Sequence, residues 1–334
     1  MMAHYRTSMR DIYRRLARLG FTRAWLLGAV LPDWWDDALA DEPANRRLAE
    51  FYLARFLDLQ LDELSDPERT LRLASGNLRF KLAAQANRER LMASALVAKR
   101  AGRLLYEVLN SSLPRFSCCA TPREVRTWIF DHGYAAVDFH SLLHFCWDQG
   151  IIVFHFKSQP GAHLDGMAAF HDERPVITLG SPKRPSWLVF HLAHELNHIL
   201  RQHVVPDSEP LADLDLDSVE VDGDEAEANR QAVEILTGSQ DVEQLRRTFK
   251  SKVEHSLFLR QNSKVLRTTP GVIALLHARL MDTGPSWRYA SAFVGEFDSG
   301  EDTDIIIGNA LSERIAGKEI SEDSSRFLAA VAAA

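Results

Sequence analysis

The sequence predicts an α+β protein that is mainly helical, with a small β-sheet near the middle of the chain. Apolar residues recur at helical spacing over the first 110 residues and again after residue 245, whereas short apolar, β-branched runs lie between residues 151 and 179. The 334 residues, 46% of them hydrophobic, suffice for two or three domains. We divide the chain into four regions, which are residues 1–66, 67–115, 116–240 and 241–334.

Charge is distributed unevenly along the chain, although the net charge is only −7. Residues 1–110 carry 18 basic and 14 acidic side chains, and the remainder carries 21 basic and 32 acidic ones. The three cysteines include the adjacent pair Cys118 and Cys119, which cannot readily bridge each other. No apolar run approaches the roughly 20 residues that cross a bilayer, and no signal peptide precedes the first helix. We therefore expect a soluble, cytoplasmic protein without a membrane partner.

The first region, residues 1–66, has short helices separated by brief loops. This succession of short helices and loops resembles that of helix-turn-helix domains of the XRE type. The candidate third helix, residues 32–42, carries five acids and no base, which is unfavourable beside DNA phosphates. We therefore expect a degenerate domain that contacts protein, with Trp34 and Trp35 in its core or interface, over one that reads DNA.

A long helical stretch with an excess of basic residues follows over residues 68–113. Its basic part, residues 67–110, allows a nucleic-acid phosphate contact, although a solvated helix face explains the same pattern. Beyond it, two helices are expected at residues 125–131 and 139–148. Strands are expected at 151–156, 166–170 and 175–179, before a long apolar helix over residues 187–203. Short helices are expected from residue 245 onward, as a regulatory or assembly module.

The apolar helix contains the sequence His194-Glu195-Leu196-Asn197-His198, an HExxH motif. Residues four apart lie on one helix face, so both imidazoles can reach a single Zn²⁺ ion at about 2.0–2.1 Å. Glu195 then projects beside the metal, where it can act as the general base for water in amide hydrolysis. The alternative is two histidines in a buried helix. Without partners, these polar groups would cost several kcal/mol there.

An acidic helix start downstream, residues 222–236, offers a third ligand for such a metal. Glu225 and Asn229 are spaced i, i+4, so a carboxylate on the metal can be accompanied by an amide that orients a histidine. Glu227 points about 200° away from Glu225 around the helix and is the weaker candidate.

The two segments HELNHIL and EAEANRQAVEIL together resemble the ImmA/IrrE family of zinc metallopeptidases. The resemblance covers about residues 120–240 and implies a zincin-like domain that binds one Zn²⁺ per chain. It implies that His194, His198 and Glu225 are ligands, that Glu195 is catalytic and that Asn229 occupies the family's Asn/Asp position. Asn197 departs from the glycine that is usual in the family.

Two further features of this region are weaker candidates. His191 lies one turn before His194 on the same helix face. It is either an accessory residue or transition-state donor beside the metal, or a packed core residue. The predicted strand over Val176, Ile177, Thr178 and Leu179 is either an edge strand that pairs with an extended substrate or an ordinary strand of the sheet. Acidic residues alternate at positions 213, 215 and 217, but this segment lacks the glycine and the glutamate that a calcium-binding loop requires. The pattern therefore indicates a solvated loop.

The leading hypothesis is a zinc metalloendopeptidase that cuts a partner protein. By the family resemblance, the partner is a helix-turn-helix repressor or antitoxin, cut in a stress, phage or toxin–antitoxin response. The rival hypothesis is a non-catalytic DNA-binding regulator or toxin–antitoxin component that uses a zinc-stabilised peptidase fold. A zinc hydrolase of small amides is a third possibility, and a homodimer is compatible with all three.

Overall fold

The computed structural model describes most of the chain and has the α+β, mainly helical composition predicted from the sequence. The described residues are 8–69, 71, 79–80, 85–117, 120–157, 164–180, 183–206, 211–213, 223–298, 300 and 302–333. Cys118, Cys119 and the acids at positions 215 and 217 lie outside them. Within the described part of the chain, no helix has the length and hydrophobicity needed to cross a membrane.

Six strands form one mixed sheet in the order β1-β5-β3-β4-β2-β6. The strands are β1 (Arg79–Phe80), β2 (Ile152–Phe156), β3 (Gly166–His171), β4 (Arg174–Leu179), β5 (Leu211–Asp213) and β6 (Ala332–Ala333). The three longer strands, β2, β3 and β4, coincide closely with the three predicted ones. β2 and β4 are parallel, whereas β3 runs antiparallel to β4. The three short strands extend the sheet at both sides.

The prediction that residues 176–179 form an edge strand is wrong. This segment belongs to β4, which pairs with β2 on one side and with β3 on the other. Val176, Ile177, Thr178 and Leu179 are all buried. Because both rows of backbone groups of β4 are already paired, the strand has no free edge for a substrate. The order of strands depends on long-range pairing, which local sequence patterns do not reveal.

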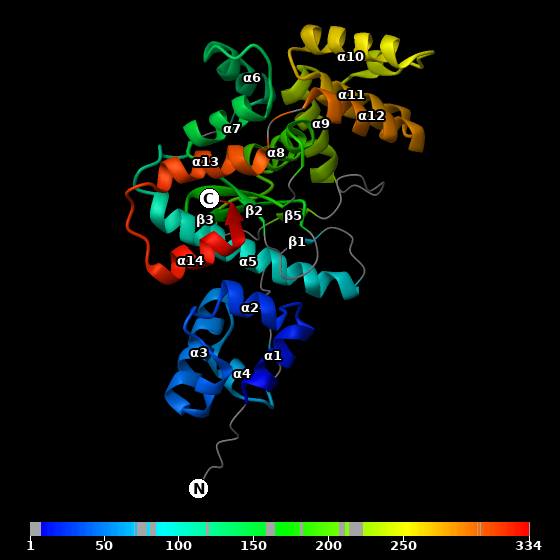
Figure 1. Cartoon of the computed structure of the whole chain (residues 1–334). Helices are drawn as coiled ribbons and strands as arrows, with labels where there is room; N and C mark the ends of the chain where they lie inside the picture. The colour runs from blue at the N-terminus through cyan, green and yellow to red at the C-terminus, as the bar shows by residue number, and fades with distance from the viewer. Residues whose placement is uncertain are drawn as a thin grey trace.

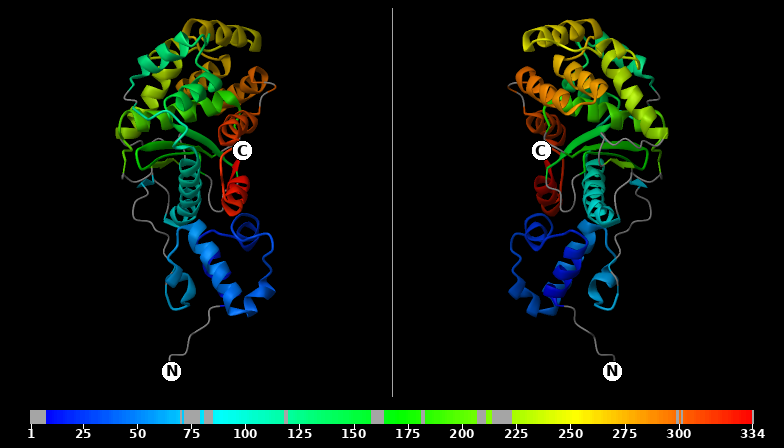
Figure 2. Two further views of the ribbon diagram at one scale, coloured as in Figure 1. Left: turned by 90° about the vertical axis from the view of Figure 1, so that its left-hand side faces the viewer. Right: turned by 90° about the vertical axis from the view of Figure 1, so that its right-hand side faces the viewer.

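Helices cover both faces of the sheet (Figures 1 and 2). The long helix α5 (Gln85–Leu109) packs on one face against β2, β3 and β4. Helices α7 (Phe139–Asp148) and α8 (Pro185–Leu200) pack on the other face, and α9 (Gly223–Thr237) lies against α8. The predicted helical stretch over residues 68–113 is therefore wrong at residues 79–80, because these form β1, which precedes α5 and pairs with β5.

The N-terminal helices form a separate layer beyond α5, at the bottom of Figure 1. They are α1 (Met9–Arg18), α2 (Arg23–Ala29), α3 (Pro43–Leu57) and α4 (Leu61–Ser65). The predicted third helix over residues 32–42 is reduced to a 3₁₀ helix, η1 (Asp37–Asp41). Asp37 accepts hydrogen bonds from Tyr13, Trp35 and Arg23, which hold this short segment against α1 and α2. Trp35 is buried, whereas Trp34 is exposed.

The remaining helices lie mainly after the HExxH motif. They are α6 (Pro122–Asp131), η2 (Glu243–Leu245), α10 (Lys252–Leu266), α11 (Pro270–Met281), α12 (Gly284–Phe297), α13 (Thr303–Ile315) and α14 (Glu322–Val331). Helices α10 to α12 lie at the end of the molecule opposite the N-terminal helices (Figure 1). In contrast, α13 packs on β2, and β6 pairs antiparallel with β2. The end of the chain thus completes the central sheet.

Helix α14 connects the N-terminal helices to the sheet. Phe327 stacks on Phe56 of α3 with ring centroids 4.8 Å apart. The Tyr52 hydroxyl donates a hydrogen bond to Asp323 at 3.0 Å, and Arg326 donates to the carbonyl oxygens of Val30 and Leu31. Because β6 follows α14 directly, these contacts attach the N-terminal helices to the same sheet that supports the HExxH helix.

Candidate metal centre

Helix α8 carries the HExxH motif through the interior of the protein. It ends at Leu200, three residues before the predicted end. Pro185 occupies its first turn, where the missing N–H removes no helical hydrogen bond. Asp298, at the end of α12, accepts hydrogen bonds from the backbone N–H and the hydroxyl of Ser186, both at 2.8 Å. This carboxylate from a distant part of the chain caps the helix and fixes the position of its N-terminus.

Helix α9 supplies the third side chain of the site. Glu225 lies in its first turn, and Ala228, Ala232 and Ile235 are buried on the same helix. Helix α9 packs against α8, and the Glu225 carboxylate reaches both histidines of the motif. The buried face of α9 therefore includes the side chain that meets the HExxH motif.

The side chains of His194, His198 and Glu225 meet in the interior and are all buried. His194 Nε2 lies 3.1 Å from Glu225 Oε2, and His198 Nε2 lies 3.3 Å from Glu225 Oε1. The two Nε2 atoms are 2.9 Å apart. Within the described residues, this is the one group of three such side chains whose ligand atoms converge closely enough to hold a metal ion. The sequence predicted these three residues.

The donor set fits a tetrahedral zinc ion. Ligands about 2.0–2.1 Å from such an ion are separated from one another by about 3.3 Å, close to the three distances in this cluster. Two imidazoles and one carboxylate are also the ligand types of catalytic zinc sites, which retain a fourth position for water or substrate. A buried carboxylate placed against two imidazoles is stabilised by a cation between them. The structure thus supports a metal site here.

Asn229 orients the first histidine, as the sequence predicted. Its Oδ1 lies 3.1 Å from His194 Nδ1. Because an amide oxygen only accepts hydrogen bonds, the imidazole proton resides on Nδ1, and the lone pair of Nε2 faces the centre of the cluster. Asn229 is one turn after Glu225 on α9, so a single helix supplies both the third ligand and the partner of another ligand.

His203 orients the second histidine and was not among the predicted site residues. Its Nδ1 lies 3.1 Å from His198 Nδ1. When His198 Nε2 serves as a ligand, its Nδ1–H donates to His203 Nδ1. His203 then carries its proton on Nε2, which faces Glu227 at 3.5 Å. His203 lies beyond the end of α8, where helical spacing no longer predicts which way a side chain points.

Glu227 acts outside the ligand set, in agreement with its predicted orientation. It accepts hydrogen bonds from Arg201 and Gln231, both at 2.9 Å. Burial opposes its ionisation, but the hydrogen bond and charge of Arg201 and the nearby His203 outweigh this effect and lower the pKa of Glu227. The carboxylate is therefore charged at neutral pH and ties the C-terminal end of α8 to α9.

Glu195 lies against the sheet at a glycine of β3. A Cβ atom added to Gly166 would be 2.2 Å from Glu195 Oε1 and 2.9 Å from its Cδ. Only a residue without a side chain therefore permits strand β3 to pass this close to the carboxylate. The sequence predicted a strand that begins at Gly166, but it did not predict the contact with Glu195.

We expect Gly166→Ala to lower the free energy of unfolding by about 1–3 kcal/mol, because the new methyl group overlaps Glu195 and forces either the carboxylate or the strand to move. Urea denaturation measures this change. Gly295→Ala in α12 is the matched control, since a Cβ at that position meets no atom within 4 Å. Equal stability of the two variants would contradict the packing of Gly166 on Glu195.

A lysine not identified from the sequence contacts His191. Lys183 Nζ lies 3.0 Å from His191 Nε2 and 2.9 Å from Asp165 Oδ1. An ammonium group only donates hydrogen bonds, so His191 accepts at Nε2 and carries its proton on Nδ1. His191 is thus a buried, neutral imidazole one helical turn before Glu195, held by a lysine–aspartate pair. This arrangement distinguishes it from an ordinary packed core histidine.

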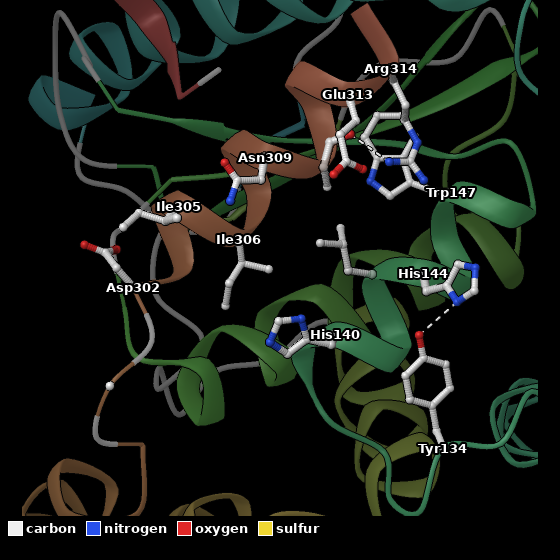
Figure 3. Close-up of a pocket in the computed structure, with 13 residues that line it drawn as sticks. Tyr134, His140, His144, Trp147, Asp302, Ile305, Ile306, Asn309, Glu313 and Arg314 are labelled. Atoms are coloured by element: carbon white, nitrogen blue, oxygen red, sulfur yellow. Dashed lines mark hydrogen bonds between the residues drawn. The ribbon is translucent and has the colours of Figure 1, made fainter.

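A separate cavity of about 510 Å³ lies between α7 and α13. Figure 3 shows His140 and His144 of α7 across this cavity from Ile306 and Asn309 of α13. None of the three metal-ligand candidates lines it. The cavity is therefore distinct from the candidate metal centre.

No family model, no curated protein and no solved structure matches the chain in comparisons with known proteins. The assignment of roles to His194, His198, Glu225 and Glu195 consequently depends on the geometry described above and on the chemistry of the donor set.

The acid at position 213 lies in β5, and the prediction of a solvated loop around it concerns mainly residues outside the described ranges.

Proposed function

We propose that the protein is a zinc-dependent metalloendopeptidase that cleaves an extended segment of a partner protein. The observation that carries this proposal is the convergence of His194, His198 and Glu225 in the interior, with Glu195 on the same helix. A structural zinc site would fill all four coordination positions with protein ligands, whereas the described residues offer three in this cluster. The motif's glutamate adds a base where a purely structural site needs none.

Each side chain around the cluster has a distinct part in this chemistry. A bound zinc ion supplies Lewis acidity, which polarises a carbonyl group and makes water a better nucleophile at neutral pH. Glu195 accepts the proton of the attacking water and returns it to the leaving amine. Asn229 and His203 hold the two imidazoles with their Nε2 lone pairs directed inward. Burial of these side chains lowers the local dielectric constant, which strengthens their electrostatic interactions.

The proposed substrate is a helix-turn-helix repressor or antitoxin, as the resemblance to ImmA/IrrE metallopeptidases implies. The N-terminal helices support protein recognition over DNA reading. The short η1 replaces a full third helix, and the acids Asp36, Asp41 and Glu42 at its two ends disfavour contact with phosphates. Exposed Trp34, Leu48 and Phe51 offer apolar contact area on the same helical layer.

The direct test is cleavage of the protein encoded by the neighbouring gene, with a helix-turn-helix protein as the expected substrate class. We expect about one zinc ion per chain by elemental analysis, cleavage by the zinc-loaded protein, loss of cleavage after treatment with a chelator and recovery on return of zinc. The chelator-treated chain is the matched control, because its sequence is identical. A purified chain without bound metal, or cleavage that persists in the chelator, would refute the proposal.

A further inference from the structure

The side of β3 that faces away from β4 is the part of the sheet best placed to present a peptide to the candidate metal centre. Gly166 begins this strand and contacts Glu195 directly. β4 pairs with one side of β3, and the other side of Gly166, Met167 and Ala168 is paired with the three-residue strand β5. A peptide paired there would run about 4.8 Å from β3, along the strand that touches the catalytic glutamate.

The opposite edge of the sheet cannot serve the same purpose. It is formed by β6, which is separated from β3 by β4 and β2. Three strand spacings of about 4.8 Å place β6 about 14 Å from β3. A peptide added beyond β6 would be farther still from Glu195. The β3 edge is thus the one at which strand addition brings a peptide bond to the site.

The chain itself occupies this edge through β5. Gly166, Met167 and Ala168 pair antiparallel with Asp213, Ala212 and Leu211, respectively. Asp213 therefore lies opposite the glycine that contacts Glu195. β5 comes from the connection between the two helices that carry the metal-ligand candidates, α8 and α9. It takes the place and the antiparallel direction that an extended substrate could adopt.

A second short strand covers the outer side of β5. Arg79 and Phe80 of β1 pair in parallel with Leu211 and Ala212. Ala212 is consequently paired on both sides, with Met167 and with Phe80. Because β1 and β5 contain two and three residues, few backbone hydrogen bonds hold them in place. A short added strand of this kind blocks an edge but can be exchanged for a longer one.

We infer that the backbone of Gly166–Ala168 is the peptide-binding edge of the enzyme and that β5 is an internal strand that inhibits the site until an extended peptide replaces it. The inference rests on the proposed peptidase function. It identifies the bound form of the substrate as an extended, antiparallel strand. It also requires that β5 leave β3 before a peptide bond can reach the metal centre.

Ala212→Pro tests this inference in the full-length, zinc-loaded chain. Proline has no N–H and is excluded from strands that are paired on both sides, so it releases β5 from β3. Ala212→Ser is the matched control, because it retains the N–H and adds a single atom. A second variant, with glycine at each of residues 211–213, weakens the strand without removing any donor and serves if the proline variant does not fold. Zinc content verifies that each variant retains the site.

Peptide binding is measured first, with Glu195→Gln present in every chain to prevent hydrolysis. The probe is a fluorescein-labelled synthetic peptide with the sequence of residues 207–217, and fluorescence anisotropy reports its binding. We expect the strand-releasing variant to bind the peptide at least about tenfold more tightly than the parent chain and Ala212→Ser. Equal affinity for all chains, with one zinc per chain, would overturn the inference.

Hydrolysis is measured next, with Glu195 restored and β-casein as an unfolded protein substrate. We expect release of β5 to raise the cleavage rate at least about tenfold. Tighter peptide binding without cleavage of casein or of the partner protein would support the binding edge but refute the peptidase function. Cleavage at an unchanged rate, with unchanged peptide affinity, would support the peptidase function but refute inhibition by β5.

Discussion

Glu195→Gln is expected to lower the rate of peptide-bond cleavage by about 10²–10⁴-fold while zinc binding is retained. The substitution preserves the size and shape of a buried side chain but removes the carboxylate that accepts a proton. Glu195 lies beside Gly166, outside the group of three ligand candidates, so its neutral replacement leaves the metal ligands in place. Initial rates on the partner protein and zinc content per chain measure the two effects separately.

Glu173→Gln is the matched control for this experiment. It also replaces a glutamate by glutamine, but Glu173 is exposed and pairs with Arg115, outside the ligand set and its hydrogen-bond partners. We expect this variant to retain cleavage within a few-fold of the parent chain. Equal rates for Glu195→Gln and the parent chain would eliminate Glu195 as the general base and leave the site without a proton acceptor of the proposed kind.

Glu225→Gln is expected to abolish stoichiometric zinc binding and, with it, all cleavage. The Glu225 carboxylate lies within 3.3 Å of both histidine Nε2 atoms and supplies the negative charge of the ligand set. Its loss should weaken zinc affinity by more than the 10–100-fold that removal of a ligand's hydrogen-bond partner typically costs. Competition with a chromogenic zinc chelator measures this affinity. Retention of tight zinc binding would exclude Glu225 as a ligand.

The same substitution should have opposite effects on stability with and without zinc. In the loaded chain, Glu225→Gln removes binding energy that favours the folded state, so the melting temperature falls. In the metal-free chain, it removes a buried carboxylate that has no cation between it and the two histidines, so stability stays equal or rises. Differential scanning calorimetry of both forms tests this reversal. A fall of the same size in both forms would indicate a purely structural role for Glu225.

Local sequence patterns were sufficient for much of the candidate metal centre. The spacing of His194 and His198 depends only on the helical repeat, and the same repeat places Asn229 one turn after Glu225. The three longer strands were also predictable, because each is a short run of apolar residues bounded by turn-forming residues. These features depend on residues close together in the chain.

Other features depended on contacts that no local pattern encodes. The prediction of an edge strand at residues 176–179 was wrong because β2 and β3 pair with both sides of β4. The prediction of a third N-terminal helix over residues 32–42 was also wrong, because hydrogen bonds from Tyr13, Trp35 and Arg23 hold Asp37 in a short 3₁₀ helix. Lys183 was missed because it lies outside the helices, where periodicity gives no direction to a side chain. His203 was missed because the predicted helix extended to residue 203, whereas α8 ends at Leu200 and the chain turns His203 toward His198.

The sequence by itself determined the chemistry of this protein's candidate site: two imidazoles and a glutamate at helical spacing, followed by a helix with a third ligand and an amide. The tertiary structure alone decided how that site is approached. Backbone hydrogen bonds between strands are nearly independent of side-chain identity, so strand order follows from the packing of the whole chain. This is why only the fold shows that Gly166 contacts Glu195 and that β5 lies on the edge beside it.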